Sequence, residues 1–147
     1  MKLQAIAILT FLIFENVMAQ ETTTAKYINS TDMEALKLTQ EWDKTFPQSD
    51  KVEHTKITFH NRYGITLAAD LYKPKNTQGR LAAIAVSGPY GAVKEQVSGR
   101  YAQTLAERGF LTIAFDPSYY GESGGTPRYL TSPEISTEDF SAAVDYL

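Results

Sequence analysis

Residues 81–116 have the sequence LAAIAVSGPYGAVKEQVSGRYAQTLAERGFLTIAFD, which contains the clearest pattern of secondary structure in the chain. Residues 81–86 are apolar throughout, which is typical of a strand that is buried on both faces. A turn that contains Gly and Pro follows, then a helical pattern over residues 93–108, then a second apolar run at 110–115. The order of strand, helix and strand predicts a βαβ unit with parallel strands.

The helix of this unit is predicted from the spacing of its apolar residues. Val97, Tyr101 and Leu105 recur every four residues, with alanines beside them. This spacing predicts an amphipathic helix with these three residues on its apolar face, ended by Gly109.

A hairpin is predicted before the βαβ unit. Residues 52–60 alternate, with His54 and His60 on one face and apolar residues on the other. Residues 61–64 form a turn signal, and 65–72 follow as a second strand, so the two strands should pair in antiparallel fashion. We expect both histidines to be half-exposed strand residues.

The last predicted element is a helix that begins at residues 136–139, after a long loop at 116–133. Phe140, Val144 and Leu147 lie on one face of this helix. A crossover helix normally leads into a further parallel strand, so the residues up to 147 leave a helix face and an apolar sheet edge uncovered. We therefore expect the first part of a larger α/β domain; the alternative is a terminal helix that packs back onto the sheet.

The N-terminal residues have the features of an export signal. A positive start is followed by an apolar run at 3–14 and by small residues ending at Ala19, which predicts a signal peptide at residues 1–19 with cleavage after Ala19. The apolar run is too short to span a bilayer comfortably, and the alternative is a buried N-terminal helix. The mature protein is expected to be periplasmic or secreted, with no membrane contact.

Residues 20–50 are interpreted as an N-terminal extension, and residues 51–147 as the start of the main domain. Within the extension, the sequence from Thr31 to Glu34 has the form of a capping box, which predicts a helix that continues to Phe46.

The composition excludes several classes of site. The 147 residues include no Cys and only two His, so thiolate chemistry and His-rich metal sites are not expected. The 14 basic and 17 acidic residues give a net charge of −3, and the sequence predicts no nucleic-acid partner. The sequence predicts no metal and no cofactor.

The turn at residues 88–91 is the first candidate site. Ligands of open α/β sheets bind outside the carboxyl ends of the strands, where this turn lies. Its backbone N–H groups can bind a phosphate or a developing oxyanion. The alternative is a tight turn that contains Gly only for steric reasons.

The loop that follows the second apolar run contains a misleading motif. Residues 121–125 match the pattern G-x-S-x-G, which marks a nucleophilic serine when a sharp strand-to-helix turn surrounds it. Here five residues separate Phe115 from Gly121, and the predicted helix begins much later. We therefore do not assign Ser123 as a nucleophile.

Taken together, these motifs resemble the N-terminal half of an α/β-hydrolase, close to dienelactone hydrolases and Xaa-Pro-peptidase-like hydrolases. The resemblance covers residues from about 50 to 147. It rests on the following runs: SGPYGAVKEQ at 87–96, AFD at 114–116, YGESGG at 120–125 and DFSAAVDYL at 139–147.

The resemblance implies a three-layer α/β/α fold and a serine hydrolase that cleaves ester, lactone or amide bonds by acyl transfer, acting on a small molecule or a peptide. The Tyr90 N–H would be one oxyanion donor, because Pro89 has no N–H. The substrate pocket wall would comprise Gly88, Pro89, Gly91, Tyr120, Glu122 and Ser123. In the family the nucleophile strand and the rest of the catalytic triad come later, so this chain is expected to stop before them and to be inactive alone.

Two other functions remain open. A nucleotide-binding Rossmann unit is suggested by Asp116, which follows the second strand, but residues 88–91 do not match G-x-G-x-x-G. An exported, non-catalytic binding module would keep the pocket wall without chemistry. Such a module should unfold cooperatively as a monomer or dimer, whereas an incomplete sheet should aggregate through its open edge.

Overall fold

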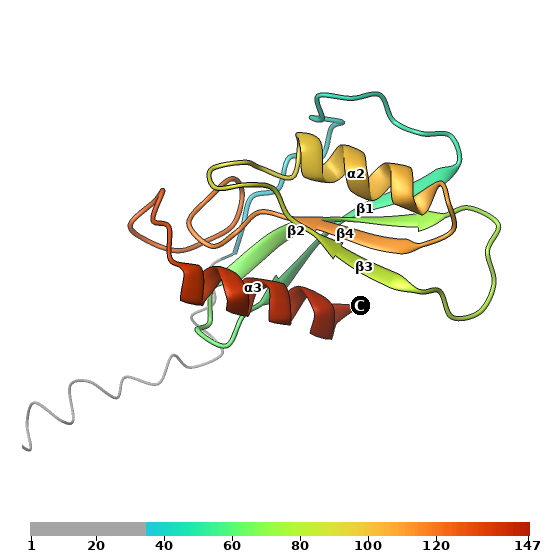
Figure 1. Ribbon diagram of the computed structural model, residues 1–147. Helices are drawn as coiled ribbons and strands as arrows, with labels where there is room; N and C mark the ends of the chain where they lie inside the picture. The colour runs from blue at the N-terminus through green and yellow to red at the C-terminus, as the bar shows by residue number, and fades with distance from the viewer. Residues whose placement is uncertain (1–34) are drawn as a thin grey trace, which may run out of the picture. The chain divides into compact units, whose positions relative to one another are not determined.

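The computed structural model describes residues 35–147 of the chain (Figure 1). The predicted signal peptide and the first part of the extension lie outside the described residues. Six elements are present in the described part: β1 (Val52–His60), β2 (Thr66–Pro74), β3 (Ala83–Val86), α2 (Val97–Ala106), β4 (Leu111–Phe115) and α3 (Pro133–Tyr146).

The described strands form one mixed sheet in the order β1-β2-β4-β3. β1 and β2 pair in antiparallel fashion, which confirms the predicted hairpin. β3 and β4 are parallel, with Ala85 opposite Ile113, which confirms the βαβ unit. β4 also pairs with β2 in antiparallel fashion, so β2 and β4 are the central strands.

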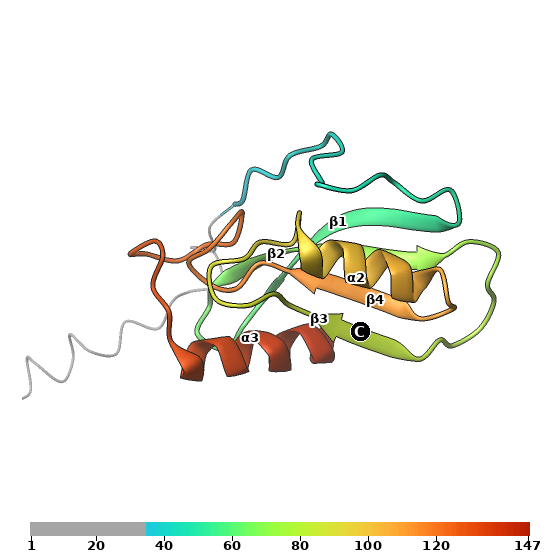
Figure 2. The ribbon, with the colours of Figure 1, turned by 45° about the horizontal axis from the view of Figure 1, so that its top comes forward.

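The two helices lie on opposite faces of this sheet (Figures 1 and 2), which gives the predicted three-layer arrangement. Side chains alternate along β4 between the two layers. Ile113 and Phe115 pack on the side of α3 with Ala142 and Ala143, whereas Ala114 packs on the side of α2. The strands therefore need apolar residues on both faces.

The prediction that β3 is buried on both faces was wrong. Ala83 is exposed and the other residues of β3 are half-buried. The reason is that β3 pairs only with β4 among the described strands, so one of its edges has no neighbour there.

The predicted apolar face of α2 is only partly correct: Ala102 and Ala106 pack on the sheet and Leu105 is half-buried, but the two large residues at its N-terminal end point to solvent. Val97 and Tyr101 are 64% and 65% exposed, whereas the buried residues are small or polar: Ser98, Gly99, Ala102, Gln103 and Ala106. A Cβ at Gly99 would lie 2.2 Å from the Lys94 carbonyl oxygen. The helix lies so close to its neighbours that only small residues fit, and this requirement overrides the apolar spacing.

Helix α3 also differs from its prediction. It begins at Pro133, with the Ser132 hydroxyl accepting a hydrogen bond from the backbone N–H of Ile135 (3.4 Å), and not at residues 136–139. Phe140 and Val144 are 42% and 61% exposed. The buried residues are Glu138, Asp139, Ala142 and Ala143.

The inward position of Asp139 follows from its hydrogen bonds. One carboxylate oxygen accepts from the Ser118 N–H (2.8 Å), and the other accepts from the Ser118 hydroxyl and the Asn61 amide (2.8 Å each). These bonds tie α3 to two loops. They turn Asp139 inward, while Val144 points to solvent and the partly exposed Phe140 ring still packs against Phe115 at 5.0 Å between centroids.

The helix predicted from residue 31 to Phe46 is absent from its described part, residues 35–46, which we call the N-terminal segment. Its backbone N–H groups bond to distant partners: Thr39 to a Glu122 carboxylate oxygen (2.7 Å) and Thr45 to the Glu95 carbonyl (2.9 Å). These tertiary bonds replace the i−4 bonds of a helix. No helix among the described residues is long and apolar enough to cross a membrane.

Candidate functional site

A hollow of about 480 Å³ lies at the carboxyl ends of β3 and β4, beside the first turns of α3. Aromatic rings and prolines form much of its wall. Its lining residues are Ser87, Gly88, Pro89, Tyr90, Gly91, Phe115, Pro117, Tyr120, Thr131, Pro133, Ser136, Thr137 and Phe140. This is the edge at which open α/β sheets bind their ligands.

The turn after β3 forms one wall of the hollow. The Ala92 N–H donates to the Pro89 carbonyl (3.0 Å) and closes the turn, which leaves the Tyr90 N–H outside this hydrogen bond. The Tyr90 side chain is 74% exposed. A Cβ at Gly88 would lie 2.6 Å from the Ala92 Cβ, so the turn needs glycine there.

The structure brings five of the sequence-predicted site residues to this hollow: Gly88, Pro89, Tyr90, Gly91 and Tyr120. The Tyr120 hydroxyl is held by Thr131 (2.6 Å) and by the carbonyl of Tyr129 (3.2 Å). Glu122 and Ser123 do not line the hollow; both belong to the tightly bonded interior of the loop after β4.

Ser123 is buried and fully engaged. Its hydroxyl donates to the Asp116 carbonyl (2.7 Å) and accepts from the Ala68 N–H (2.9 Å). These bonds fasten the loop to β2. Both partners of the Ser123 hydroxyl are backbone groups, and neither can act as a general base. Ser123 is therefore a structural residue.

The two histidines have different surroundings. His60 is exposed, whereas His54 is half-buried with 14% of its side chain exposed, so the expectation of half-exposed residues holds for His54 and not for His60. His54 Nε2 lies 2.8 Å from Asp70 Oδ1, and the His54 ring packs against Trp42 at 5.2 Å between centroids. The N-terminal segment covers this part of β1, which explains the burial.

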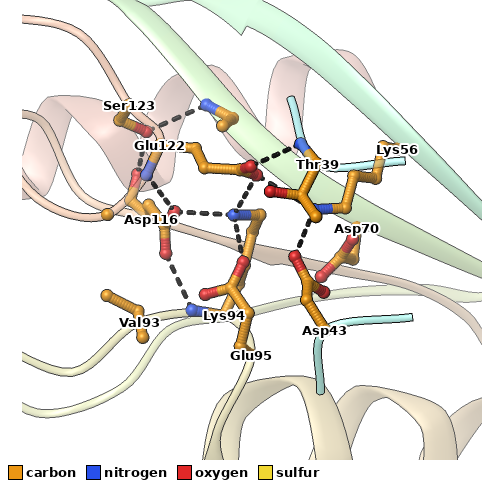
Figure 3. Close-up of polar contacts among 12 residues, drawn as sticks. Thr39, Asp43, Lys56, Asp70, Val93, Lys94, Glu95, Asp116, Glu122 and Ser123 are labelled. Atoms are coloured by element: carbon orange, nitrogen blue, oxygen red, sulfur yellow. Dashed lines mark hydrogen bonds and ion pairs between the residues drawn. The ribbon is translucent and has the colours of Figure 1, made fainter. Parts of the chain in front are cut away.

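A buried ion pair, which the sequence did not predict, joins the turn after β3 to the loop after β4 (Figure 3). The Lys94 side chain is fully buried, and its Nζ lies 2.8 Å from Asp116 Oδ2 and 2.8 Å from Glu122 Oε2; it also donates to Glu95. The backbone N–H of Lys94 donates to the other oxygen of Asp116 (2.7 Å). Although desolvation lowers the pKa of Lys94, these carboxylates raise it overall and keep the amine charged.

The ion pair extends into a larger network through Glu122. Lys56 on β1 bridges Glu122 (3.0 Å) and Asp43 (2.8 Å), and Lys44 continues from Asp43 to Asp70 (3.0 Å). We call this set the ionic network: Lys44, Lys56, Lys94, Asp43, Asp70, Glu95, Asp116 and Glu122.

The network shifts the acidity of its carboxyl groups in two directions. Desolvation raises the pKa of Glu122, but hydrogen bonds from Lys94, Thr39 and Lys56 outweigh it and lower the pKa to about 2. The balance is the same for Asp43, whose lysine partners lower its pKa to about 2. For Glu95, desolvation and the neighbouring Asp116 raise the pKa above its ordinary value.

Oxygens of Asp43, Glu95 and Glu122 lie within 4.8 Å of one another, close enough to hold a cation. Each of these carboxylates, however, pairs with at least one lysine of the network. The ammonium groups supply the positive charge that a metal would bring. This cluster is therefore an ion-pair arrangement.

Sequence signals for the network existed. Asp116 directly follows a buried strand, and Lys94 follows the Gly-containing turn within the run that carries the family resemblance. What the sequence could not show is that the two side chains meet, since 22 residues separate them.

Comparisons with known proteins bear on the fold and the superfamily. No family model matches the chain. The chain is 70% identical over 126 residues to the uncharacterized protein PA2218 of Pseudomonas aeruginosa, covering 85% of this chain and 34% of that protein. It is 52% identical to the uncharacterized protein YcjY of Escherichia coli (64% and 32% covered) and 30% identical to the thiohydrolase aneE of Aspergillus aculeatus (67% and 30% covered).

Solved structures show the same fold. The crystal structure of PA2218 matches with a TM-score of 0.75 and 74% identity, covering 77% of this chain and 36% of that one. The α/β-hydrolase GrgF of a Penicillium species matches at 0.56 and 26% identity (64% and 32% covered). Est1E of Butyrivibrio proteoclasticus, with ferulic acid bound, matches at 0.53 and 26% identity (61% and 36% covered).

The described residues therefore have the α/β-hydrolase fold, and these likenesses support membership of the α/β-hydrolase superfamily. The chain spans about a third of the length of the relatives that it matches.

Proposed function

We propose that this chain is the N-terminal part of an exported serine hydrolase that cleaves acyl bonds. The hollow carries this proposal, because it joins the turn at 87–91 to a largely apolar wall at the carboxyl ends of β3 and β4. Such a site can hold an acyl group while backbone N–H groups stabilise the oxyanion.

In this proposal Tyr90 acts through its backbone. Its N–H lies outside the hydrogen bond that closes the turn and is available to a developing oxyanion. The attacking serine, its histidine and the acid would come from later parts of the domain, as in hydrolases whose triad follows the first βαβ unit. The reaction would form and then hydrolyse an ester on that serine.

The relatives support a hydrolase-type function in general. Two of them are named thiohydrolase, and we propose thioesters as a further bond beside the esters, lactones and amides expected from the family resemblance. Est1E holds ferulic acid, an aromatic acid. The aromatic rings that line the hollow fit a substrate with an apolar or aromatic acyl group. We place the protein near the dienelactone and Xaa-Pro-peptidase-like hydrolases on its quoted motifs.

The mixed sheet argues against the nucleotide-binding alternative. The β1–β2 hairpin pairs directly with β4, whereas a dinucleotide-binding sheet is mostly parallel. The non-catalytic binding module differs from the hydrolase in that it lacks a nucleophile. A reagent that labels a nucleophilic serine therefore distinguishes the two.

The test uses the native product caught from its own cells with an antibody to residues 51–147. A mass well above 16.4 kDa, together with labelling by a serine-directed fluorophosphonate, is the expected result. A mass near that of residues 20–147 and no labelling would overturn the hydrolase for this product and favour the binding module. N-terminal sequencing of the same product tests export, with Gln20 expected as the first residue.

A further inference from the structure

We propose that Lys94 and Asp116 are positioning residues of the candidate active site, which hold the turn at 87–91 against the loop at 116–125. This inference rests on the proposed function, because it assigns to the ionic network the task of fixing the Tyr90 N–H beside the hollow. Neither residue lines the hollow, so both act through the backbone that they hold.

The carboxylate of Asp116 connects the two loops directly (Figure 3). One of its oxygens accepts from the Lys94 backbone N–H (2.7 Å). The other accepts from Lys94 Nζ (2.8 Å) and from the Glu122 N–H (2.8 Å). Since Lys94 follows the turn after β3 and Glu122 belongs to the loop after β4, a single buried carboxylate connects the two walls of the hollow.

The loop after β4 encloses this carboxylate without spare room. Asp116 is fully buried. A Cβ at Gly121 would lie 2.1 Å from Asp116 Oδ2, and Gly121 has a φ of +51°, which glycine adopts most readily. The Arg128 guanidinium donates to the carbonyls of Gly121 and Ser123 and closes the loop from outside.

The turn is consequently anchored at both of its ends. Val86 pairs with Ala114 in the sheet immediately before the turn. Lys94, three residues after Gly91, is anchored by its backbone N–H and by its charge. Displacing Lys94 would leave a buried ammonium and the Asp116 carboxylate unpaired, which is strongly unfavourable in the interior. A buried charge pair therefore resists movement more than an apolar contact would.

Such stiffness matters for an oxyanion donor. Preorganised donors act because they need not reorganise when charge develops, and a site loosened by about 1 Å loses much of its rate. The hydrogen bond from the Tyr90 N–H to the oxyanion would form mainly in the transition state. Loosening the turn should therefore lower kcat and leave KM nearly unchanged.

Lys44 provides a matched control. Its side chain is also fully buried and paired with two carboxylates, Asp43 and Asp70, but it contacts neither loop of the hollow. Lys44→Met removes the same charge from the same network. It should cost comparable stability without releasing the turn.

The experiment compares the native product, purified from its own cells, with its Lys94→Met and Lys44→Met variants. Hydrogen exchange of residues 87–93 and 117–122 should accelerate at least about tenfold more than that of β2 in Lys94→Met, and should follow β2 in Lys44→Met. Fluorophosphonate labelling should slow about 100-fold in Lys94→Met only, with KM for 4-nitrophenyl acetate changed less than about threefold.

Equal acceleration of residues 87–93 in both variants would overturn the positioning role and make Lys94 a general stabilising residue. So would a loss of activity that appears entirely in KM. An absence of labelling in the unmodified product would overturn the proposed hydrolase instead, and the exchange measurement would still decide whether Lys94 positions the turn.

Discussion

The described domain has one side that its own residues complete and another that they leave bare. On the first side, the N-terminal segment, β1 and the two loops meet in the ionic network, where each lysine is paired with carboxylates. The second consists of the outward faces of α2 and α3, one on each face of the sheet (Figure 1), where Val97, Tyr101 and Val144 are exposed within residues 35–147.

The difference shows which interactions a local part of a fold satisfies first. Buried charges need partners within the described residues, because an unpaired charge in the interior has a prohibitive free-energy cost. Apolar helix faces can remain exposed, since their exposure costs only the hydrophobic free energy. Bare faces of this kind fit our proposal that further parts of a hydrolase domain cover them.

The largest effect is expected from removing the centre of the completed side. Asp116→Ala leaves Lys94 buried with one carboxylate fewer and two backbone N–H groups without their acceptor. We expect a loss of about 3–5 kcal/mol in the free energy of unfolding, measured by urea titration. A loss below about 1 kcal/mol would show that water or a side-chain shift replaces the carboxylate.

A smaller effect is expected from crowding the same carboxylate. Gly121→Ala places a Cβ 2.1 Å from Asp116 at a positive φ and should destabilise the protein by about 2 kcal/mol. The matched control is Gly79→Ala, because Gly79 also has a positive φ but a Cβ there would meet no atom within 4 Å. Its cost should be limited to the backbone strain, and equal costs would show that the loop yields easily.

Acid should weaken the completed side selectively. The pKa of Glu122 is lowered to about 2 in the folded protein, so its ionised form stabilises the fold above about pH 5, and this stabilisation is lost as the pH falls toward 2. Glu122→Gln should remove about 1 kcal/mol at pH 7, because Glu122 is partly exposed and solvent screens its pairs.

The urea midpoint of the Glu122→Gln variant should then fall less steeply between pH 5 and pH 3 than that of the unmodified protein. Some pH dependence remains, since Asp43 also has a pKa of about 2. Parallel pH profiles would contradict the assignment.

The smallest effect is expected on the bare side. Val144→Ser in the chain of 147 residues should change the free energy of unfolding by less than about 0.5 kcal/mol, because Val144 is largely exposed there. In a longer native product whose further segments cover α3, the same change should cost about 1–3 kcal/mol. Equal small effects in both would show that this face stays exposed.

The strands were predictable because their signals are local. Alternation indicated β1, and continuous apolar runs indicated β3 and β4. The structure has all three strands there, although β3 is not buried on both faces. The Gly- and Pro-containing turn at 88–91 and its place at the end of a parallel strand also followed from order along the chain.

The helix faces and the N-terminal segment were not predictable in this way. The spacing of Val97 and Tyr101 indicated that both side chains point inward, but the close approach at Gly99 leaves them exposed, and only the neighbouring alanines of α2 pack on the sheet. The capping box before residue 35 indicated a helix up to Phe46, but the N–H groups of Thr39 and Thr45 found acceptors in distant loops. Tertiary hydrogen bonds and packing outweigh a local propensity of a few tenths of a kcal/mol per residue.

The fold class, the strand order within the βαβ unit and the turn in which we propose that the Tyr90 N–H acts could therefore be predicted from the sequence, because each depends on residues close together in the chain. The meeting of Lys94, Asp116 and Glu122 and the hydrogen bonds that make Ser123 a structural residue are known only from the tertiary structure. Those pairings depend on which loops lie next to each other at the sheet edge, and no periodicity along the chain indicates how close two distant loops lie in space.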